Sequence, residues 1–232
     1  MDARQINVQM IAEEFINNGD PLGWFEKVYT NANGDVLSIP WVNLSPHPML
    51  MEWLQKHHRR EEGLRALVIG CGLGDDAEEL ARGGFKVTAF DISPRAIEWC
   101  KERFKNSPVD YQAMDLFKTP DEWRHSFDFV LESRTLQSLP LSFRKQAIEH
   151  IARYVGLFGK LLVVARGKDL EQEVEGPPWP LIKSELQAFK RCGLKEMFLE
   201  DYLDQETPPK RHFCAAYVAI DPQLIEEAKP RG

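Results

Sequence analysis

The sequence predicts an α/β protein with a doubly wound, mostly parallel sheet of seven strands, an antiparallel C-terminal hairpin and helices on both faces. Three observations predict it. Short apolar runs alternate with helical patterns from about residue 66 to 165, which is typical of a parallel sheet. A glycine-rich turn follows the first run, as in nucleotide-binding folds. Two apolar runs then follow one another without a helix between them, which indicates a hairpin.

The first sixty residues predict helical and irregular structure rather than strands. A first amphipathic helix is expected over residues 5–16, followed by a short aromatic turn from Trp24 to Tyr29 and an Asn-rich loop to Asp35. Residues 38–50 read SIPWVNLSPHPML, and their three prolines exclude a regular helix or central strand. A helix over residues 49–57 is then expected to lead into the first strand.

The remaining elements are predicted from the apolar pattern and from residues that begin or end helices. Asp75 and Asp76 are predicted to cap the helix after the glycine turn, and Ser93 to cap the next one with Pro94 at its first position. Further helices are expected over residues 142–154 and from Ser184 to about residue 192. The strands are expected at residues 66–69, 85–90, 109–113, 127–131, 160–165, 194–199 and 212–220.

Composition limits the class of protein. At 232 residues and 43% hydrophobic content, we expect one domain over residues 1–232, with a helical and aromatic cap (1–60) and a core (61–221). The four cysteines show no metal-ligand or disulfide spacing, so no metal site is predicted and a reducing, cytoplasmic location is expected. No signal peptide or membrane span is expected. A net charge of −7 disfavours nucleic-acid binding.

The stretch LRALVIGCGLGDDAEELARGGFKVTAFD, residues 64–91, is the centre of the functional prediction. It reads as strand, glycine turn, helix and strand with Asp91 at the second strand's carboxyl end, a Rossmann-like layout that binds adenosine-type ligands. A dinucleotide fingerprint requires glycine at position 75, where Asp75 would repel a pyrophosphate. S-adenosylmethionine carries no phosphate, so it is the predicted cofactor. A purely structural turn is the alternative.

The strand tips supply the predicted cofactor contacts. Gly70, Cys71 and Gly72 are expected beneath the methionyl part, and Asp91 to accept hydrogen bonds from the ribose hydroxyls. Asp115 is expected to accept from the adenine amine, with a capping role as the alternative. Ile92 and Met114 would line the ring, and Glu132 is a further candidate or else a solvent-facing strand end. Trp24, Tyr29 and Trp41 either cover the core's open edge or close over cofactor and substrate.

These motifs resemble class I S-adenosylmethionine-dependent methyltransferases and, more narrowly, the thiopurine S-methyltransferase-like superfamily, which includes thiol and halide methyltransferases. The narrower resemblance rests on W-x-x-x-x-Y (residues 24–29), I-P-W with P-x-P (39–48), GCGLGDDA, LPLSFR and the GPPWP segment (176–180).

The chain departs from these families at three places. Val68 and Ile69 replace a common acidic residue, so Glu132 or backbone carbonyls would receive the methionyl ammonium. Trp41 precedes Val42 rather than Asp, and the fourth strand ends in Glu132-Ser133-Arg134 rather than Asp-Arg-Gly. The last two changes concern the acceptor rather than the cofactor.

The resulting hypothesis is methyl transfer from S-adenosylmethionine to a small-molecule acceptor, for example a thiol or another soft nucleophile, by a monomer or homodimer. The alternatives are a non-catalytic S-adenosylmethionine-binding module and an NAD-dependent oxidoreductase. Arg134, Arg166 and Trp179 are candidate acceptor contacts beside Trp24 and Tyr29, and Trp179 is either a lid or packed at the sheet edge. No catalytic residue is assigned, although His47 or Tyr29 would be the base for a hydroxyl or amine acceptor.

Overall fold

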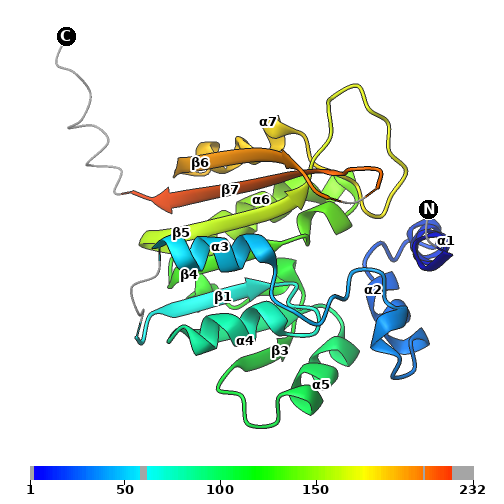
Figure 1. The fold of residues 1–232 in the computed structure, drawn as a ribbon, viewed down its shortest axis with the longest axis horizontal. Helices are drawn as coiled ribbons and strands as arrows, with labels where there is room; N and C mark the ends of the chain where they lie inside the picture. Colours follow the sequence, from blue (N-terminus) through cyan, green and yellow to red (C-terminus); the bar gives the residue numbers. More distant parts are fainter. Residues whose placement is uncertain (1–2, 58–61, 206, 221–232) are drawn as a thin grey trace.

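The structure is a computed structural model that describes residues 3–57, 62–205 and 207–220 (Figure 1). Its centre is one seven-stranded sheet with the order β3-β2-β1-β4-β5-β7-β6. The predicted fold class is therefore confirmed. The strands are β1 (Arg65–Ile69), β2 (Lys86–Asp91), β3 (Asp110–Ala113), β4 (Phe127–Ser133), β5 (Val155–Arg166), β6 (Leu194–Leu203) and β7 (Arg211–Ala219).

Strands β1 to β5 are parallel, and β7 joins β5 antiparallel with β6 at the edge. The last two strands thus form the expected hairpin. Because the first five strands run the same way, their carboxyl ends meet at one edge of the sheet. The strand order continues from β1 to one side through β2 and β3, and to the other side through β4 and β5. That edge is where a ligand site is expected.

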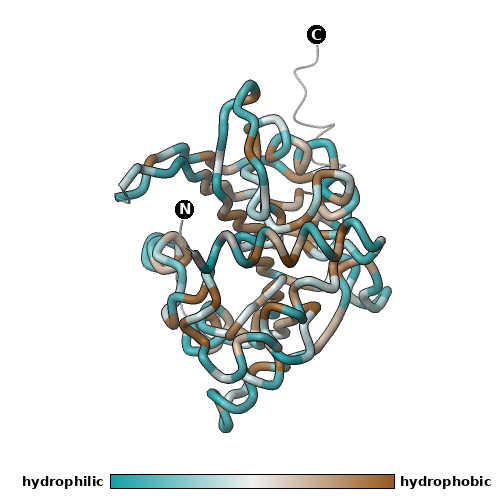
Figure 2. The backbone as a smooth tube through the Cα atoms, turned by 90° about the vertical axis from the view of Figure 1, so that its right-hand side faces the viewer, coloured by the Kyte–Doolittle hydropathy of each residue, from teal (hydrophilic) through white to brown (hydrophobic). Residues whose placement is uncertain are grey.

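The alternation of side chains along β1 explains how both sheet faces are buried. Leu67 and Ile69 join one apolar cluster, whereas Ala66 and Val68 join a second cluster on the other face. Helices α6 (Leu141–Tyr154), α7 (Lys183–Leu186) and α8 (Ala188–Arg191) cover the first face. Helices α3 (Pro48–His57), α4 (Asp75–Arg82) and α5 (Pro94–Arg103) cover the second. Figure 2 shows the hydrophobic segments gathered inside and hydrophilic residues at the loop tips.

Two helices, α1 (Ala3–Asn17) and α2 (Trp24–Asn31), lie beyond the carboxyl edge of the sheet (Figure 1). The predicted aromatic turn at residues 24–29 was wrong, because this segment is the helix α2. Trp24 and Val28 stand one turn apart and are both buried, and Glu26 Oε2 accepts from Ser93 Oγ (2.5 Å) and Arg95 N (3.2 Å). The helix is therefore fixed by contacts with α5 that local pattern does not reveal.

The predicted caps have different outcomes. Ser93 accepts from Ala96 N at 3.1 Å with Pro94 at the first helical position, as expected. Asp75 and Asp76 do not cap α4, whose N-cap is Gly74 with φ of 88°. Asp75 instead binds Arg103 through two hydrogen bonds of 2.8 and 3.0 Å. Asp76 Oδ1 accepts from His47 N at 2.6 Å. Both carboxylates therefore fasten neighbouring segments to the turn.

The proline-containing segment is irregular over residues 39–47, in agreement with the prediction, and the short 3-10 helix η1 (Val36–Ser38) comes directly before this part. Further 3-10 turns are η2 (Leu116–Lys118), η3 (Asp121–Trp123) and η4 (Leu136–Ser138). In the part of the chain described, no helix is long and apolar enough to cross a bilayer. The predicted boundary between cap and core, at residues 60 and 61, lies outside the described residues.

Candidate active site

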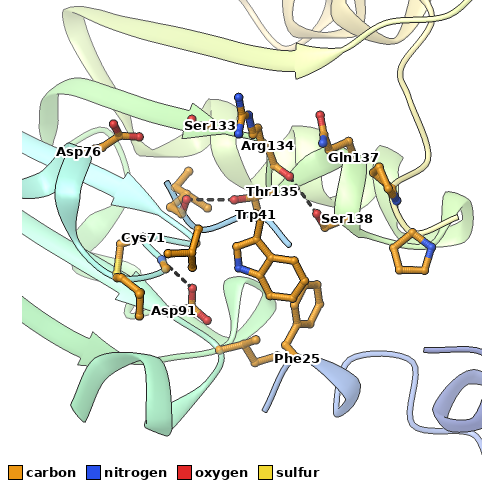
Figure 3. Close-up of a pocket in the computed structure, with 18 of the residues that line it drawn as sticks. Phe25, Trp41, Cys71, Asp76, Asp91, Ser133, Arg134, Thr135, Gln137 and Ser138 are labelled. Carbon is orange, nitrogen blue, oxygen red and sulfur yellow. Dashed lines mark hydrogen bonds between the residues drawn. The ribbon is translucent and has the colours of Figure 1, made fainter. Parts of the chain in front are cut away.

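A cavity of about 470 Å³ opens at the carboxyl edge of the sheet, within the size range of small-molecule sites (Figure 3). Its walls come from the tips of β1 to β5, from α1 and α2, and from the proline-containing segments before α3 and after β5. Twelve of the fourteen predicted contact residues line it: Trp24, Tyr29, Trp41, Gly70, Cys71, Gly72, Asp91, Ile92, Met114, Asp115, Arg134 and Arg166.

The glycine turn forms the floor of the cavity at the tip of β1. Gly70 and Gly72 have φ of 59° and 54°, a region that residues with a Cβ rarely adopt. A Cβ at Gly72 would meet only the Tyr29 hydroxyl, at 3.4 Å, whereas a Cβ at Gly70 would lie 2.3 Å from Thr135 Oγ1. The space over Gly72 is thus open to a ligand, while Gly70 packs against the protein.

Asp91 stands at the tip of β2, beside this turn. Its Oδ2 accepts from Gly72 N at 2.9 Å (Figure 3), and its Oδ1 accepts from Ser93 N at 3.0 Å. The side chain is 7% exposed, and burial raises its pKa to about 6, although these hydrogen bonds act in the opposite direction. A buried carboxylate that borders a cavity and accepts only from backbone amides retains acceptor capacity for ligand hydroxyls.

The tip of β3 adds an apolar wall and a second carboxylate. Ile92 and Met114 line the cavity next to Asp91, and Met114 N donates to Asp91 O. Asp115 Oδ1 accepts from Phe117 N at 2.9 Å, so it does cap the turn that follows. It also borders the cavity. The two roles that the sequence left open for Asp115 are therefore compatible.

Aromatic side chains enclose the cavity from the N-terminal side. Trp41 Nε1 donates to the Tyr29 hydroxyl at 3.0 Å, and the two rings meet edge to face. Trp24 stacks on Phe25 and meets Trp41 edge to face. Burial, aided by Asp91, raises the pKa of Tyr29 well above its ordinary value. Tyr29 therefore remains a neutral phenol at any working pH.

The tip of β4 shapes the other half of the cavity. Arg134 has φ of 66°, its amide donates to Val164 O at 2.8 Å, and its carbonyl accepts from Ser138 Oγ at 3.0 Å. Thr135 Oγ1 donates to Ile69 O at 3.0 Å (Figure 3). These backbone contacts fix the turn that presents Ser133, Arg134 and Gln137 to the cavity.

Arg134 also contacts His47, from the segment before α3. The Arg134 Nη2 lies 3.0 Å from His47 Nε2, and His47 Nδ1 accepts from Met49 N at 3.1 Å. Burial, together with the positive charge of Arg134, lowers the pKa of His47 to about 3. Arg166 borders the same half from the end of β5.

Two predicted contact residues lie outside the cavity lining. Glu132 is fully buried, so the solvent-facing alternative was wrong, and its Oε1 accepts from Leu136 N at 2.8 Å, a contact that supports the β4 turn. Trp179 folds over Gly176, its amide donates to Gln137 O at 2.6 Å and its carbonyl accepts from Arg144. Pro177 and Pro178 of the same segment are the residues that border the cavity.

Several lining residues were absent from the sequence prediction. Six of them lie within or close to sequence motifs that were recognised, and this proximity was the available signal: Phe25, Asp76, Thr135, Gln137, Pro177 and Pro178. Gln5 carries no such signal. It reaches the cavity from α1, where its Nε2 donates to Pro177 O at 2.6 Å, a contact between residues 172 apart in the chain.

Comparisons with known proteins agree with this geometry. A family described as a methyltransferase domain matches residues 66–156. The ubiquinone biosynthesis O-methyltransferase of Methylocella silvestris is 32% identical over 121 residues, which is 46% of this chain and 47% of that protein. The chain thus spans less than half of the length of that curated relative.

Solved structures show the same fold across most of the chain. A structure concerned with conversion of a disulfide bond into a thioacetal group during echinomycin biosynthesis has a TM-score of 0.69 at 16% identity, covering 89% of this chain and 96% of that one. The Burkholderia thailandensis 1,6-didemethyltoxoflavin-N1-methyltransferase, bound to its substrate and S-adenosylhomocysteine, has a TM-score of 0.66 at 14% identity, covering 85% and 88%.

Residues 66–156 therefore match a methyltransferase domain, and the chain shares its fold with solved S-adenosylmethionine-dependent methyltransferases. These matches agree with the S-adenosylmethionine cofactor that the glycine spacing and Asp75 predict.

Proposed function

We propose that this protein transfers the methyl group of S-adenosylmethionine to a small-molecule acceptor bound over the tips of β4 and β5. The observation that carries the proposal is the shared cavity, in which the open backbone at Gly72 and the buried Asp91 face one half and Arg134 and Arg166 border the other. A binding module without catalysis would need only the first half.

The residues of the first half fit the adenosyl part of the cofactor. Asp91 would accept from the ribose hydroxyls, Ile92 and Met114 would contact the adenine ring, and Asp115 would accept from its amine. Gly72 would let the backbone approach the methionyl part because only the Tyr29 hydroxyl stands near its missing Cβ. When bound, the cofactor supplies an electrophilic methyl group on a sulfonium.

The protein's own contribution would be orientation and exclusion of water. Holding a nucleophile in line with its target supplies about 7–11 kcal/mol of a displacement barrier. The aromatic wall of Trp24, Tyr29 and Trp41 and the prolines 177 and 178 enclose the space where this alignment would occur.

The two candidate bases are unsuited to proton removal. Tyr29 stays protonated, and His47, with a pKa of about 3, is too weak a base at neutral pH. This supports an acceptor that reaches the site already ionised, such as a thiolate. Methylation of a phenolic oxygen is the second candidate. It is supported by the relatives' O-methyltransferase function and by Asp76, a cavity-lining carboxyl whose pKa burial raises.

The cofactor assignment is tested by calorimetric titration with S-adenosylhomocysteine and, separately, with NAD. We expect saturable binding of the first and none of the second. Binding of NAD alone would contradict the proposal.

The reaction is tested with thiol, halide and phenol panels, with S-adenosylhomocysteine release as the readout. A thiol acceptor should give turnover that rises with pH toward a thiol pKa of about 8.5, whereas a halide has no substrate proton to lose. Turnover of phenols alone, lost in Asp76→Asn, would select O-methylation. A protein that binds the cofactor but methylates no panel member would favour the non-catalytic alternative.

A further inference from the structure

The cavity has an acidic half at the tips of β2 and β3 and a basic half at the tips of β4 and β5, where Asp76 also lies close to Arg134. Asp91 and Asp115 stand at the tips of β2 and β3, whereas Arg134 and Arg166 stand at the tips of β4 and β5. In the sheet order, β2 and β5 are three strand spacings apart, which is about 14 Å. Asp91 and Arg134 accordingly lie in different parts of the cavity in Figure 3. The basic half is therefore separate from the predicted ribose contact.

His47 reveals a hydrogen-bonding conflict in the basic half. Both of its ring nitrogens face N–H donors, Nδ1 the amide of Met49 and Nε2 the guanidinium of Arg134. A neutral imidazole accepts at only one nitrogen, so in either tautomer one contact sets two donors against each other. An oxyanion placed between Arg134 and His47 would accept from both and remove the conflict.

Two carboxylates lie near the basic half, and one of them, Asp76, interacts electrostatically with Arg134. Asp76 Oδ1 accepts from His47 N at 2.6 Å, and Asp204 Oδ2 lies 2.9 Å from His212 Nε2. Among the described residues, Arg166 makes no side-chain ion pair, although its backbone amide donates to Gln137 Oε1 at 2.5 Å. Arg166 thus lines the cavity at a position that its backbone contact with Gln137 holds.

We propose that the methyl acceptor carries an oxyanion group, a carboxylate or a phosphate, bound by Arg134 and Arg166 with His47 as an additional donor. This inference rests on the proposed methyl transfer and names its substrate class. Guanidinium groups form paired, charge-assisted hydrogen bonds with both kinds of oxyanion. The bound group would fix the acceptor over β4 and β5 and leave its nucleophilic atom directed toward the glycine turn.

The experiment measures binding of matched probes to the protein saturated with S-adenosylhomocysteine. The probes are benzoate and benzamide, 4-mercaptobenzoate and 4-mercaptobenzamide, and phenyl phosphate. We expect each carboxylate to bind at least about tenfold more tightly than its amide, with the preference weakened by salt. Phenyl phosphate shows which oxyanion is preferred.

Arg134→Gln and Arg166→Gln should each remove most of the preference. The matched control is Arg82→Gln, an arginine whose side chain is 66% exposed and lies outside the cavity lining. Melting temperature and S-adenosylhomocysteine affinity establish that each variant is folded and binds cofactor.

Three outcomes would overturn the inference: equal affinity for carboxylates and amides, no saturable binding of any probe, or a preference that survives both cavity variants. Reduced S-adenosylhomocysteine affinity in Arg166→Gln with an unchanged probe preference would assign that arginine to the cofactor's own carboxylate and also overturn it. Failure of S-adenosylhomocysteine to bind the unmodified protein would instead overturn the proposed function.

Discussion

At the residue scale, Asp91 combines a structural and a predicted ligand role. Its two oxygens accept from Gly72 N and Ser93 N, so it joins the glycine turn to the start of α5. Sequence reasoning located Asp91 because a carboxylate after the second strand is a positional signal. It missed Glu132's supporting role because burial of a strand-end carboxylate depends on the turn that folds back over it.

Asp91→Asn should weaken S-adenosylhomocysteine binding by at least about tenfold near pH 8, since a charge-assisted hydrogen bond contributes about 1.5–3 kcal/mol. Because the carboxyl of the free protein has a pKa of about 6, affinity of the unmodified protein should fall as pH drops through that value. Calorimetry across pH measures both effects. Asp121→Asn, on a side chain that is 98% exposed, is the control. Unchanged affinity in folded Asp91→Asn would remove the ribose assignment.

Gly70 and Gly72 should respond differently to substitution. Gly70→Ala introduces a Cβ 2.3 Å from Thr135 Oγ1 and should lower the melting temperature strongly. Gly72→Val fills the cavity and should abolish S-adenosylhomocysteine binding, with a stability loss of only about 1–2 kcal/mol from its positive φ. Gly34→Ala isolates that backbone effect, since nothing lies within 4 Å of its Cβ. Normal cofactor binding by Gly72→Val would make the turn purely structural.

Glu132 should make stability depend on pH. Burial raises its pKa from 4.5 to about 7, so folding favours the protonated carboxyl. That contribution, about 3 kcal/mol, is present below pH 4.5 and is lost as pH rises through about 7. Urea unfolding of Glu132→Gln at about pH 5 and about pH 8 should show a smaller pH difference than the unmodified protein. Equal pH dependence in both proteins would contradict this account, and exposed Glu122→Gln is the control.

At the scale of elements, local pattern predicted strands and helices better than the contacts that join them. The helix after Ser93 begins as predicted because its cap is local, whereas Asp75 and Asp76 bind Arg103 and His47 from distant segments. Residues 24–29 form a helix whose Glu26 accepts hydrogen bonds from Ser93 and Arg95 at the start of α5. From sequence alone, a helix and a turn are not distinguishable in these six residues, because the contact with α5 is not visible there.

The segment from Gly176 to Pro180 reaches the cavity, but through its prolines rather than its tryptophan. Trp179 packs over Gly176, so Trp179→Ala should lower the melting temperature by several degrees while S-adenosylhomocysteine affinity changes less than about twofold. Thermal unfolding and calorimetry measure these effects, and Leu170→Ala, an exposed position in the preceding loop, is the control. A folded variant of unchanged stability with reduced kcat/KM for the acceptor would restore the lid hypothesis.

At the scale of the molecule, the alternation of strands and helices indicates a parallel sheet, which is why the sheet and its carboxyl-edge site were predictable. The long-range contacts that close the cavity were not predictable from the sequence. Gln5 and Pro177 meet across 172 positions, and α1 and α2 lie against that edge through contacts that no spacing in the sequence records. Long-range contacts of this kind decide the shape of the acceptor half.

Cofactor binding should therefore stabilise one edge of the molecule more than the rest. At about 100 times its Kd, S-adenosylhomocysteine should raise the free energy of unfolding by about 2.7 kcal/mol, and NAD should leave it unchanged. Hydrogen exchange should slow in α2, in residues 70–74 and at the tip of β4, which border the cavity, and remain unchanged in the hairpin of β6 and β7. Asp91→Asn should lose this protection at the same ligand concentration. Protection centred on the hairpin, or equal protection by NAD, would show that the ligand does not bind the cavity described by the glycine turn and Asp91.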